Sequence, residues 1–237
     1  MTEKNPRIKA KAAIIDTDGT LIETTKRFCF VFNKLLRERG REPLGWEKFL
    51  ERYIADTLDD LVAPSQEGGR EEMLHEFWLE FLRRYRAVDV AEDQLIPGVK
   101  EVLADISGTG IPIAVITSCI VPSDQLREEL ARYGLSEFVD TVVTGDDAIY
   151  DLNKEHHFSK REIFRLAAEK LGVAPQDCVV VGDYWNDVRD GRAIGTKTVA
   201  VLTGLMRREL LMKAEPDAII ESIRDLPKVV TFEVSRP

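Results

Sequence analysis

The feature of this sequence that most constrains its fold is a regular alternation of short apolar segments with longer amphipathic segments from residue 97 onward. Short apolar runs bounded by turn residues are typical of buried strands, and the amphipathic segments have helical periodicity. The predicted strands, including one near the N-terminus, cover 11–16, 111–117, 138–145, 177–183, 196–202 and 217–220. The predicted helices cover 97–107, 123–133, 160–171, 185–194, 206–213 and 221–226. This order predicts an α/β fold with a doubly wound, Rossmann-like parallel sheet that has helices on both faces.

A charged, aromatic-rich region at residues 22–95 interrupts this pattern, and its periodicity is helical. The predicted helices cover 27–40, 47–62 and 70–88, with a loop at 63–69. We therefore expect one strand and then only helices in the first 95 residues. The expected organisation is a core domain formed by 1–21 and 96–237, with a helical domain, 22–95, inserted after the first strand.

Two groups of side chains in the helical region can be interpreted from their pattern. The aromatic stripe is predicted to be packed inside the region, and it consists of Phe28, Phe30, Phe32, Phe77, Trp78 and Phe81. The basic run that contains Arg83, Arg84 and Arg86 is interpreted as a solvated helix face.

The charge balance excludes some partners. The chain has 33 Lys and Arg against 42 Asp and Glu, a net charge of −9, which argues against nucleic acid or an anionic membrane as a partner. Its three cysteines, Cys29, Cys119 and Cys178, form no CxxC pair and are interpreted as core residues of a protein in a reducing compartment. The sequence has no apolar run near ~18 residues and no signal-peptide pattern, so we expect a cytoplasmic protein.

The first predicted strand ends in the sequence Asp16-Thr17-Asp18-Gly19-Thr20. Two carboxylates at a strand end, followed by a glycine turn, can hold a hard divalent cation beside a phosphate that the following backbone amides bind. A calcium-binding loop does not fit, because its glycine is the sixth residue, whereas the glycine here is the fourth. Ligands of open α/β sheets bind at the carboxyl ends of the strands, so this segment is a candidate site.

Two other predicted strands end in residues that would face the same crevice. Thr117 and Ser118 follow one strand, and Asp183 follows another, with Asp187 one helical turn later. Together with the two acids of the first strand, four carboxylates would converge and repel one another unless a cation lay between them. The pattern therefore predicts a combined metal and phosphate site.

These motifs resemble those of the haloacid dehalogenase (HAD) superfamily. The resemblance rests on DTDGTL at 16–21, a hydroxyl at Thr117, a lysine before the helix that ends in EKLGV, and VVVGDYWND at 179–187. It covers most of the chain and implies a helical cap at 22–95, as in phosphoglycolate phosphatase-like members. It also implies a phosphatase that uses Mg²⁺ and an aspartyl-phosphate intermediate to hydrolyse a small phosphorylated metabolite, of the phosphoglycolate or sugar phosphate type.

The resemblance also implies roles for individual residues. Asp16 would be the nucleophile, and Asp18 the general acid and base. Mg²⁺ would bind Asp16, Asp183 and the backbone carbonyl of Asp18, with Asp187 orienting these groups. Thr117 and Lys160 would also be catalytic, by holding and neutralising the phosphoryl group. The implied phosphate-binding residues are Thr17, Gly19, Thr117, Ser118 and Lys160.

The lysine is where this sequence departs from its relatives. They usually carry Lys-Pro-x-Pro before this helix, and neither proline is present here. Lys160, in FSKREIF, is the favoured candidate, and Lys154 is the alternative. A long loop at 146–159 precedes the helix and contains a pair of histidines, His156 and His157, without zinc-type spacing.

Alternatives of function and substrate remain open at this point. A sugar phosphomutase shares the motifs, and a non-catalytic protein that binds phosphorylated ligands is a second alternative. Dehalogenases and phosphonate-cleaving members of the superfamily lack an acid at the position of Asp18, so we expect neither of these activities. The cap is expected to select the substrate, and an anionic leaving group would meet Lys26, Arg27, Arg52 and Tyr53. We expect a monomer or homodimer with no nucleic-acid or membrane partner.

Overall fold

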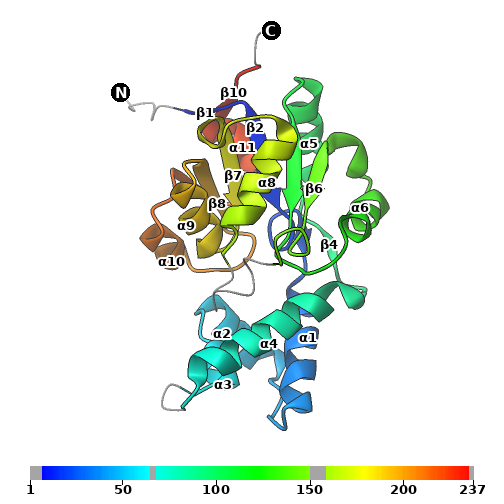
Figure 1. Ribbon diagram of the computed structural model, residues 1–237, viewed down its shortest axis with the longest axis vertical. Helices are drawn as coiled ribbons and strands as arrows, with labels where there is room; N and C mark the ends of the chain where they lie inside the picture. Colours follow the sequence, from blue (N-terminus) through cyan, green and yellow to red (C-terminus); the bar gives the residue numbers. More distant parts are fainter. Residues whose placement is uncertain (1–6, 65–67, 150–158, 235–237) are drawn as a thin grey trace.

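The computed structural model describes residues 7–64, 68–149 and 159–234. Within these residues, the centre is a six-stranded parallel sheet with strand order β6-β5-β2-β7-β8-β9 (Figure 1). Its strands are β2 (Ala12–Asp16), β5 (Ile113–Ile116), β6 (Thr141–Val143), β7 (Cys178–Gly182), β8 (Lys197–Val201) and β9 (Ala218–Ile220). The predicted α/β fold with a doubly wound parallel sheet is confirmed.

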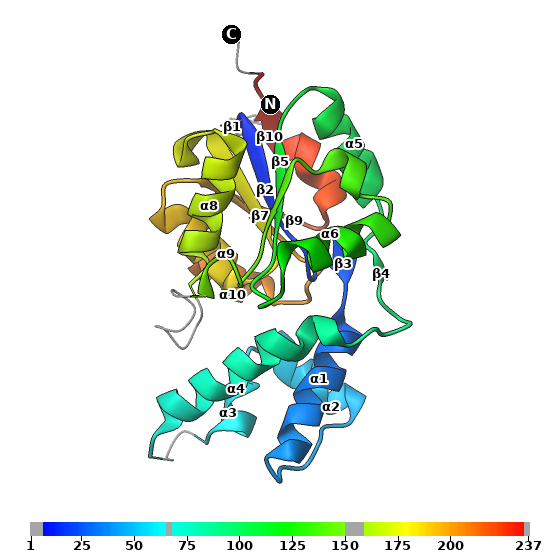
Figure 2. The same cartoon turned by 45° about the vertical axis from the view of Figure 1, so that its right-hand side comes forward.

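Both faces of the sheet are apolar because successive residues of a buried strand point to opposite sides. Ala13 and Ile15 of β2 belong to the core on one face, and Ala12 and Ile14 belong to the core on the other. The first face is covered by α5 (Val99–Gly108), α6 (Ser123–Arg132) and α11 (Leu226–Val229). The second is covered by α8 (Arg161–Leu171), α9 (Trp185–Ala193) and α10 (Arg208–Lys213), as Figure 2 shows.

The helical region lies between two short strands that pair antiparallel, β3 (Ile22–Glu23) and β4 (Gln94–Leu95). It contains α1 (Thr25–Glu38), α2 (Trp46–Ile54), α3 (Asp59–Val62), α4 (Arg70–Arg84) and a 3₁₀ turn (Tyr85–Ala87). Figures 1 and 2 show it as a separate layer at one end of the sheet. No helix among the described residues has the length and apolar character needed to cross a lipid bilayer.

The predicted aromatic stripe is packed inside this region with one exception. Phe28 contacts six other rings among the described residues, for example Phe81 at a centroid distance of 4.5 Å and Tyr53 at 4.9 Å. Phe30 was predicted to pack with them, but its surface is 51% exposed. It lies two residues from both Phe28 and Phe32 on α1, and positions two apart do not share a helix face.

The single helix predicted at 47–62 is wrong, because the chain breaks after α2. Asp56 has a φ of 56°, in the left-handed region that a right-handed helix cannot include. The chain therefore turns before α3 starts at Asp59. The turn directs Asp56 toward α9, where its carboxylate accepts hydrogen bonds from two aromatic side chains.

Short elements near the termini also differ from the prediction. Three strands of two or three residues, β1 (Ile8–Ala10), β3 and β4, lie in the segment expected to have one strand and then only helices. The predicted last helix at 221–226 is instead a 3₁₀ turn (Ile223–Asp225) followed by α11 and β10 (Val230–Phe232), which pairs in parallel with β1. Segments this short carry too little periodicity to be identified from sequence.

A buried network of charges joins the helical region to the sheet. Arg86 was interpreted as part of a solvated face, but this is wrong, because its side chain is only 1% exposed. The helix ends at Arg84, so helical periodicity does not describe the direction of Arg86. Its guanidinium pairs with Glu129 of α6, which also pairs with Arg27 of α1 at 2.8 Å. Arg27 in turn contacts Asp93 at 2.7 Å.

The protonation of Glu129 depends on this network. Burial alone would raise the pKa of its carboxyl, but the guanidiniums of Arg86 and Arg27 outweigh burial and hold the pKa below its ordinary value. Glu129 therefore stays charged in the folded protein to a lower pH than in the unfolded chain, and its pairing stabilises the fold at neutral pH.

Replacing Glu129 by glutamine (Glu129→Gln) is expected to lower the free energy of unfolding by roughly 3–5 kcal/mol at pH 7, because two buried guanidiniums lose their shared anion. This loss of stability should be complete above the pKa of Glu129 in the unfolded chain, about 4.3. It should shrink as the pH falls through the lower pKa of Glu129 in the folded protein. Urea unfolding at stepwise lower pH measures it, with the exposed neighbour Glu128→Gln as control. Equal unfolding free energies at pH 7 for Glu129→Gln and wild type would contradict this account.

Candidate active site

The strand order places three predicted site residues at one edge of the sheet. β2 is central, with β5 on one side and β7 on the other, and Asp16 lies beside Ile116. The chain continues from β5 outward on one side and from β7 outward on the other, which makes the carboxyl end of β2 a switch point. Asp16, Thr117 and Asp183 directly follow or end these neighbouring strands, so they meet at this crevice.

Three carboxylates lie together here, those of Asp16, Asp183 and Asp187. Among the described residues, their oxygens form a group within 4.8 Å of one another, and all three side chains are buried. Burial raises the pKa of Asp16 to about 7, with Lys160 opposing this and the charges of Asp187 and Asp18 adding to it. Burial and the charges of Asp16 and Asp187 raise the pKa of Asp183 well above its ordinary value, with Lys160 opposing them. Buried like charges at this distance need a proton or a cation between them, and an all-oxygen set suits Mg²⁺.

Two glycines leave the room in which Asp183 sits. A Cβ on Gly204 would lie 1.7 Å from Asp183 Oδ2, and one on Gly19 would lie 2.5 Å from it. The Thr20 hydroxyl donates to Asp183 Oδ1 at 3.3 Å. Gly19 was predicted to bind phosphate, but its N–H donates to the Ile22 carbonyl at 2.7 Å within the turn. The cradle around Asp183 fits a carboxylate that is held in place for a cation.

Lys160 lies among these acids, just before α8. Its Nζ is 3.0 Å from Asp16 Oδ1 and 2.6 Å from Asp187 Oδ1. Burial would lower the pKa of Lys160, but the two carboxylates outweigh burial and raise it above its ordinary value, so the ammonium stays charged. The other oxygen of Asp187 accepts a hydrogen bond from the Tyr184 N–H at 3.1 Å, at the start of α9. The alternative lysine, Lys154, and the histidine pair lie outside the described residues.

The hydroxyl-bearing residues after β5 face the same cavity. Thr117 Oγ1 donates to Asp18 Oδ2 at 3.4 Å and accepts from the Cys119 N–H at 3.2 Å. The Ser118 hydroxyl is buried and has no hydrogen-bond partner among the described residues. Thr17 differs from both, because its hydroxyl donates to the Ile116 carbonyl at 2.7 Å and ties β2 to β5. Any contact of Thr17 with a ligand would therefore come from its backbone.

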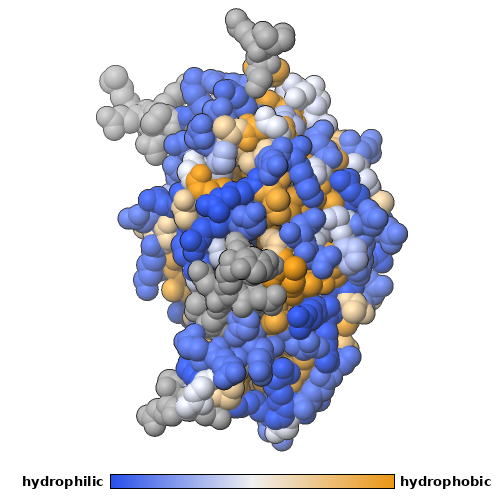
Figure 3. All heavy atoms as spheres, in the orientation of Figure 1, coloured by the Kyte–Doolittle hydropathy of each residue, from blue (hydrophilic) through white to orange (hydrophobic). Residues whose placement is uncertain are grey.

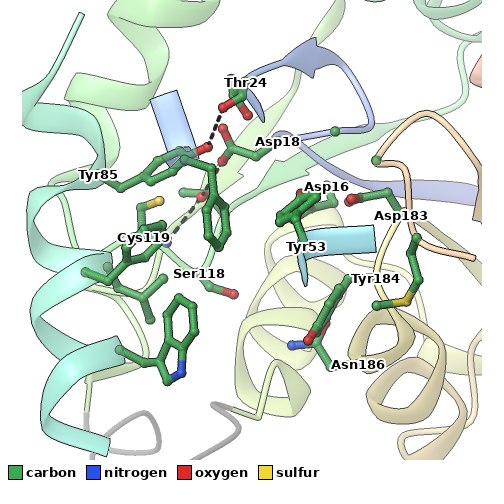
Figure 4. Close-up of a pocket in the computed structure, with 18 of the residues that line it drawn as sticks. Asp16, Asp18, Thr24, Tyr53, Tyr85, Ser118, Cys119, Asp183, Tyr184 and Asn186 are labelled. Carbon is green, nitrogen blue, oxygen red and sulfur yellow. Dashed lines mark hydrogen bonds between the residues drawn. The ribbon is translucent and has the colours of Figure 1, made fainter. Parts of the chain in front are cut away.

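Asp18 points away from the other three acids, so three carboxylates converge rather than the four expected. Its Oδ2 accepts hydrogen bonds from Arg86 and Thr117. Figure 4 shows Asp18 on the Tyr85 side of the cavity and Asp16 close to Asp183. Arg86 is therefore a site residue that the sequence did not identify, because it lies outside every motif and within a basic run.

None of the three basic residues expected to meet a leaving group lines the cavity. Tyr53 lines the cavity, whereas Lys26, Arg27 and Arg52 do not. The Lys26 ammonium lies 3.3 Å from the centre of the Trp46 ring. Arg27 is held in the buried network described above.

A contact between α9 and the helical region was also missed. The Tyr184 hydroxyl donates to Asp56 Oδ1 at 2.5 Å, and Trp185 Nε1 donates to Asp56 Oδ2 at 3.0 Å. A turn near Asp56 could have been predicted from the sequence. Nothing in the sequence indicates that the Asp56 side chain contacts Tyr184 and Trp185. The contact closes one side of a cavity of about 440 Å³, lined by both parts of the molecule.

A protein-family model described as haloacid dehalogenase-like hydrolase matches residues 13–201. The chain belongs to this family. The pyrophosphatase PpaX of Bacillus pumilus is 29% identical over 217 residues, which cover 92% of this chain and 94% of that protein. A phosphoglycolate phosphatase of Yersinia pestis is 27% identical over 220 residues, which cover 91% of each chain.

Solved structures of haloacid dehalogenase-like proteins share this fold. A hydrolase of this type from Bacteroides fragilis superposes with a TM-score of 0.69 at 18% identity, covering 92% of this chain and 99% of that one. A predicted phosphoglycolate phosphatase from Haemophilus somnus superposes with a TM-score of 0.65 at 20% identity, covering 93% and 97%. The similarity at this level of identity concerns the fold, and it extends through both the sheet and the helical region.

Replacing Gly204 by alanine (Gly204→Ala) is expected to weaken Mg²⁺ binding roughly 10–100-fold, because the added Cβ displaces the Asp183 carboxylate. Isothermal titration with Mg²⁺ measures this without substrate. Gly108→Ala is the matched control, since a Cβ at this exposed end of α5 meets no atom within 4 Å. A folded Gly204→Ala protein with wild-type Mg²⁺ affinity would exclude Asp183 as a ligand.

Proposed function

We propose that this hydrolase is a Mg²⁺-dependent phosphatase that hydrolyses a small phosphorylated metabolite through an aspartyl-phosphate intermediate. The observation that carries the proposal is the buried ammonium of Lys160 between Asp16 and Asp187, in the wall of a cavity that Asp16 and Lys160 both line. A carboxylate beside a fixed cation at a strand end can approach an anionic phosphoryl group that it would otherwise repel. The names of the relatives support the phosphatase class.

The chemistry proceeds in two steps on this chain's own residues. In the first, an Asp16 oxygen bonds to phosphorus as the bond from phosphorus to the leaving alkoxide breaks, and Asp18 gives the alkoxide its proton. In the second, Asp18 takes a proton from a water whose oxygen attacks phosphorus, and the bond to Asp16 breaks. The products are the alcohol and inorganic phosphate, and both carboxyl groups return to their starting states.

The two acids of this mechanism have different neighbours. Asp16 lies beside the Lys160 ammonium, whereas Asp18 lies beside Arg86 and the Thr117 hydroxyl. Two acids that are two residues apart on the chain are thus paired with different cations.

The proposed ligands of Mg²⁺ are the carboxylates of Asp16 and Asp183 and the backbone carbonyl of Asp18. When bound, the ion supplies positive charge that stabilises the carboxylates and the phosphoryl oxygens. Asp187 is proposed to orient rather than to bind, because its two oxygens already accept hydrogen bonds from Lys160 and from the Tyr184 N–H.

The proposed phosphate-binding groups lie around the same point. The unpartnered hydroxyl and the backbone N–H of Ser118, the Thr117 hydroxyl and the Lys160 ammonium can each donate to phosphate oxygens. The backbone amides of Thr17 and Asp18 complete the proposed set. Gly19 is proposed to act mainly by leaving room for Asp183.

We extend the proposal to the domain organisation, with 1–21 and 96–237 as the core and 22–95 as a cap. The cap would cover the site and exclude water during transfer of the phosphoryl group. The contacts of Asp56 with Tyr184 and Trp185 support a closed arrangement, because they join the helical region to α9 beside the cavity.

Asp16→Asn should abolish release of inorganic phosphate from phosphomonoesters in the presence of Mg²⁺, because an amide cannot form the covalent intermediate. Thermal unfolding should remain cooperative, and Asp124→Asn, an exposed residue of α6, is the control. Wild-type turnover by the Asp16→Asn protein would refute the mechanism. In wild type, phosphate release also distinguishes a phosphatase from a sugar phosphomutase, which returns the phosphoryl group to its substrate.

Lys160→Met is expected to lower kcat roughly 10²–10³-fold, as loss of one preorganised charge donor does in other enzymes. Steady-state kinetics measures this, and far-ultraviolet circular dichroism checks the fold. Lys154→Met is the comparison, and it should keep wild-type kcat. If Lys154→Met loses activity while Lys160→Met keeps it, the site lysine is Lys154.

A further inference from the structure

The cavity has two chemically distinct ends. The inner end holds the acids, Lys160 and the hydroxyls that the proposed function assigns to the phosphoryl group. The outer end is formed by the helical region and the start of α9, and its residues are mostly aromatic or aliphatic. A leaving group attached to a phosphoryl group at the inner end would extend into the outer end.

The outer end has aromatic rings on two sides. From the helical region come Phe28, Tyr53 and Phe81, with Phe28 in ring contact with both of the others. From α9 and the residue before it come Trp185 and Tyr184, whose ring centroids are 5.4 Å apart. Figure 4 shows the Tyr53 and Tyr184 rings on one side of the cavity and Tyr85 on the other. Such walls favour an apolar occupant that buries its surface against them.

One outer face of the helical region differs in character from this wall. The face shown in Figure 3 is mostly hydrophilic over the helical region. Leu82 and Met206 add aliphatic surface to the cavity. A volume of about 440 Å³ lies in the range of roughly 300–1,000 Å³ that is typical of pockets for drug-sized ligands. The cavity is therefore large for a two-carbon leaving group.

The charges at the outer end oppose an anion. Asp56 and Asp59 both line the cavity. Asp56 accepts hydrogen bonds from a phenol and an indole, and Asp59 accepts one from Trp78 Nε1 at 2.7 Å. Among the described residues that line the cavity, Lys160 is the single cation, and Asp16 and Asp187 already hold it.

We propose that the substrate is a phosphomonoester whose leaving group is apolar and carries no negative charge, and is of the size of an aromatic ring or larger. This inference rests on the proposed phosphatase function and deepens it. A carboxylate or a second phosphate in the leaving group would face Asp56, Asp59 and the π faces of the rings. This chain would thus differ in leaving group from the phosphoglycolate phosphatases and pyrophosphatases that it resembles.

The first test compares kcat/KM of the wild-type protein with Mg²⁺ on esters of primary alcohols, so that the reacting bond is similar. Benzyl phosphate is the apolar ester, phosphoglycolate the anionic one, phosphocholine the cationic one and ethyl phosphate the small neutral one. We expect benzyl phosphate to exceed each of the others at least tenfold, as burial of one ring in an apolar pocket allows. A smaller preference, or a preference for any other ester, overturns the inference.

This comparison separates the two possible failures. If the protein releases phosphate neither from any of these esters nor from acetyl phosphate, the proposed function itself fails. If it releases phosphate but prefers phosphoglycolate or phosphocholine, the phosphatase stands and the apolar leaving group is wrong.

The second test adds a cation to the apolar wall. Leu82 is half-buried and lines the cavity, and its backbone carbonyl bonds to Ile120 N–H, a contact that Leu82→Lys keeps. The variant should reduce the ratio of kcat/KM for benzyl phosphate over phosphoglycolate at least tenfold. Leu61→Lys is the matched control, a half-buried leucine of the same region that does not line this cavity.

The ratio measured for Leu61→Lys should equal that of wild type. If Leu82→Lys is folded by thermal unfolding and its ratio also equals that of wild type, the inference is overturned. If Leu82→Lys does not fold, the comparison of esters with the wild-type protein tests the inference by itself.

Discussion

The structure depends on an electrostatic constraint at the carboxyl end of β2, where the carboxylates of Asp16, Asp183 and Asp187 are buried within 4.8 Å of one another. Such a group persists only with compensating positive charge. Lys160 supplies part of it through contacts with two of the acids. The third, Asp183, is set against Gly204, where any larger residue would collide with it. A divalent cation can balance the negative charge that Lys160 does not compensate. The doubly wound sheet brings these residues to one point.

The helical region takes part in the same electrostatics from the other side of the cavity. Arg86 contacts Asp18 and also belongs to the buried network with Glu129 and Arg27. The position of the Asp18 carboxylate is therefore coupled to the packing of the helical region on α6. A change in how this region sits on the sheet would alter the surroundings of Asp18 while leaving Asp16 and Lys160 in place. This coupling links the elements that would cover the site to the residue proposed to carry protons.

The sheet and most of the strand-end residues could be predicted because the signals are local. Buried strands have continuous apolar runs, and parallel strands end at the same edge, so Asp16 and Asp183 must meet once the strand order is known. The burial of Arg86 could not be predicted in this way. Arg83 is exposed and Arg86 is buried in the same basic run, and only contacts with a distant helix separate them. The break at Asp56 and the pairing of β1 with β10 depend in the same way on partners far along the chain.

Similarity to other proteins is therefore more informative about the residues at one end of the cavity than about those at the other. The end proposed to bind phosphate is formed by short motifs whose residue types the proposed chemistry requires, so membership of the family carries information about it. The end proposed to take the leaving group is formed by Phe28, Tyr53 and their neighbours in the helical region, where any apolar side chain of suitable size can pack. Relatives at 27–29% identity differ from this chain at most positions, so the residues of the wall are free to differ. The choice of leaving group therefore has to be read from the wall of this cavity, and its rings and carboxylates favour an apolar group without negative charge.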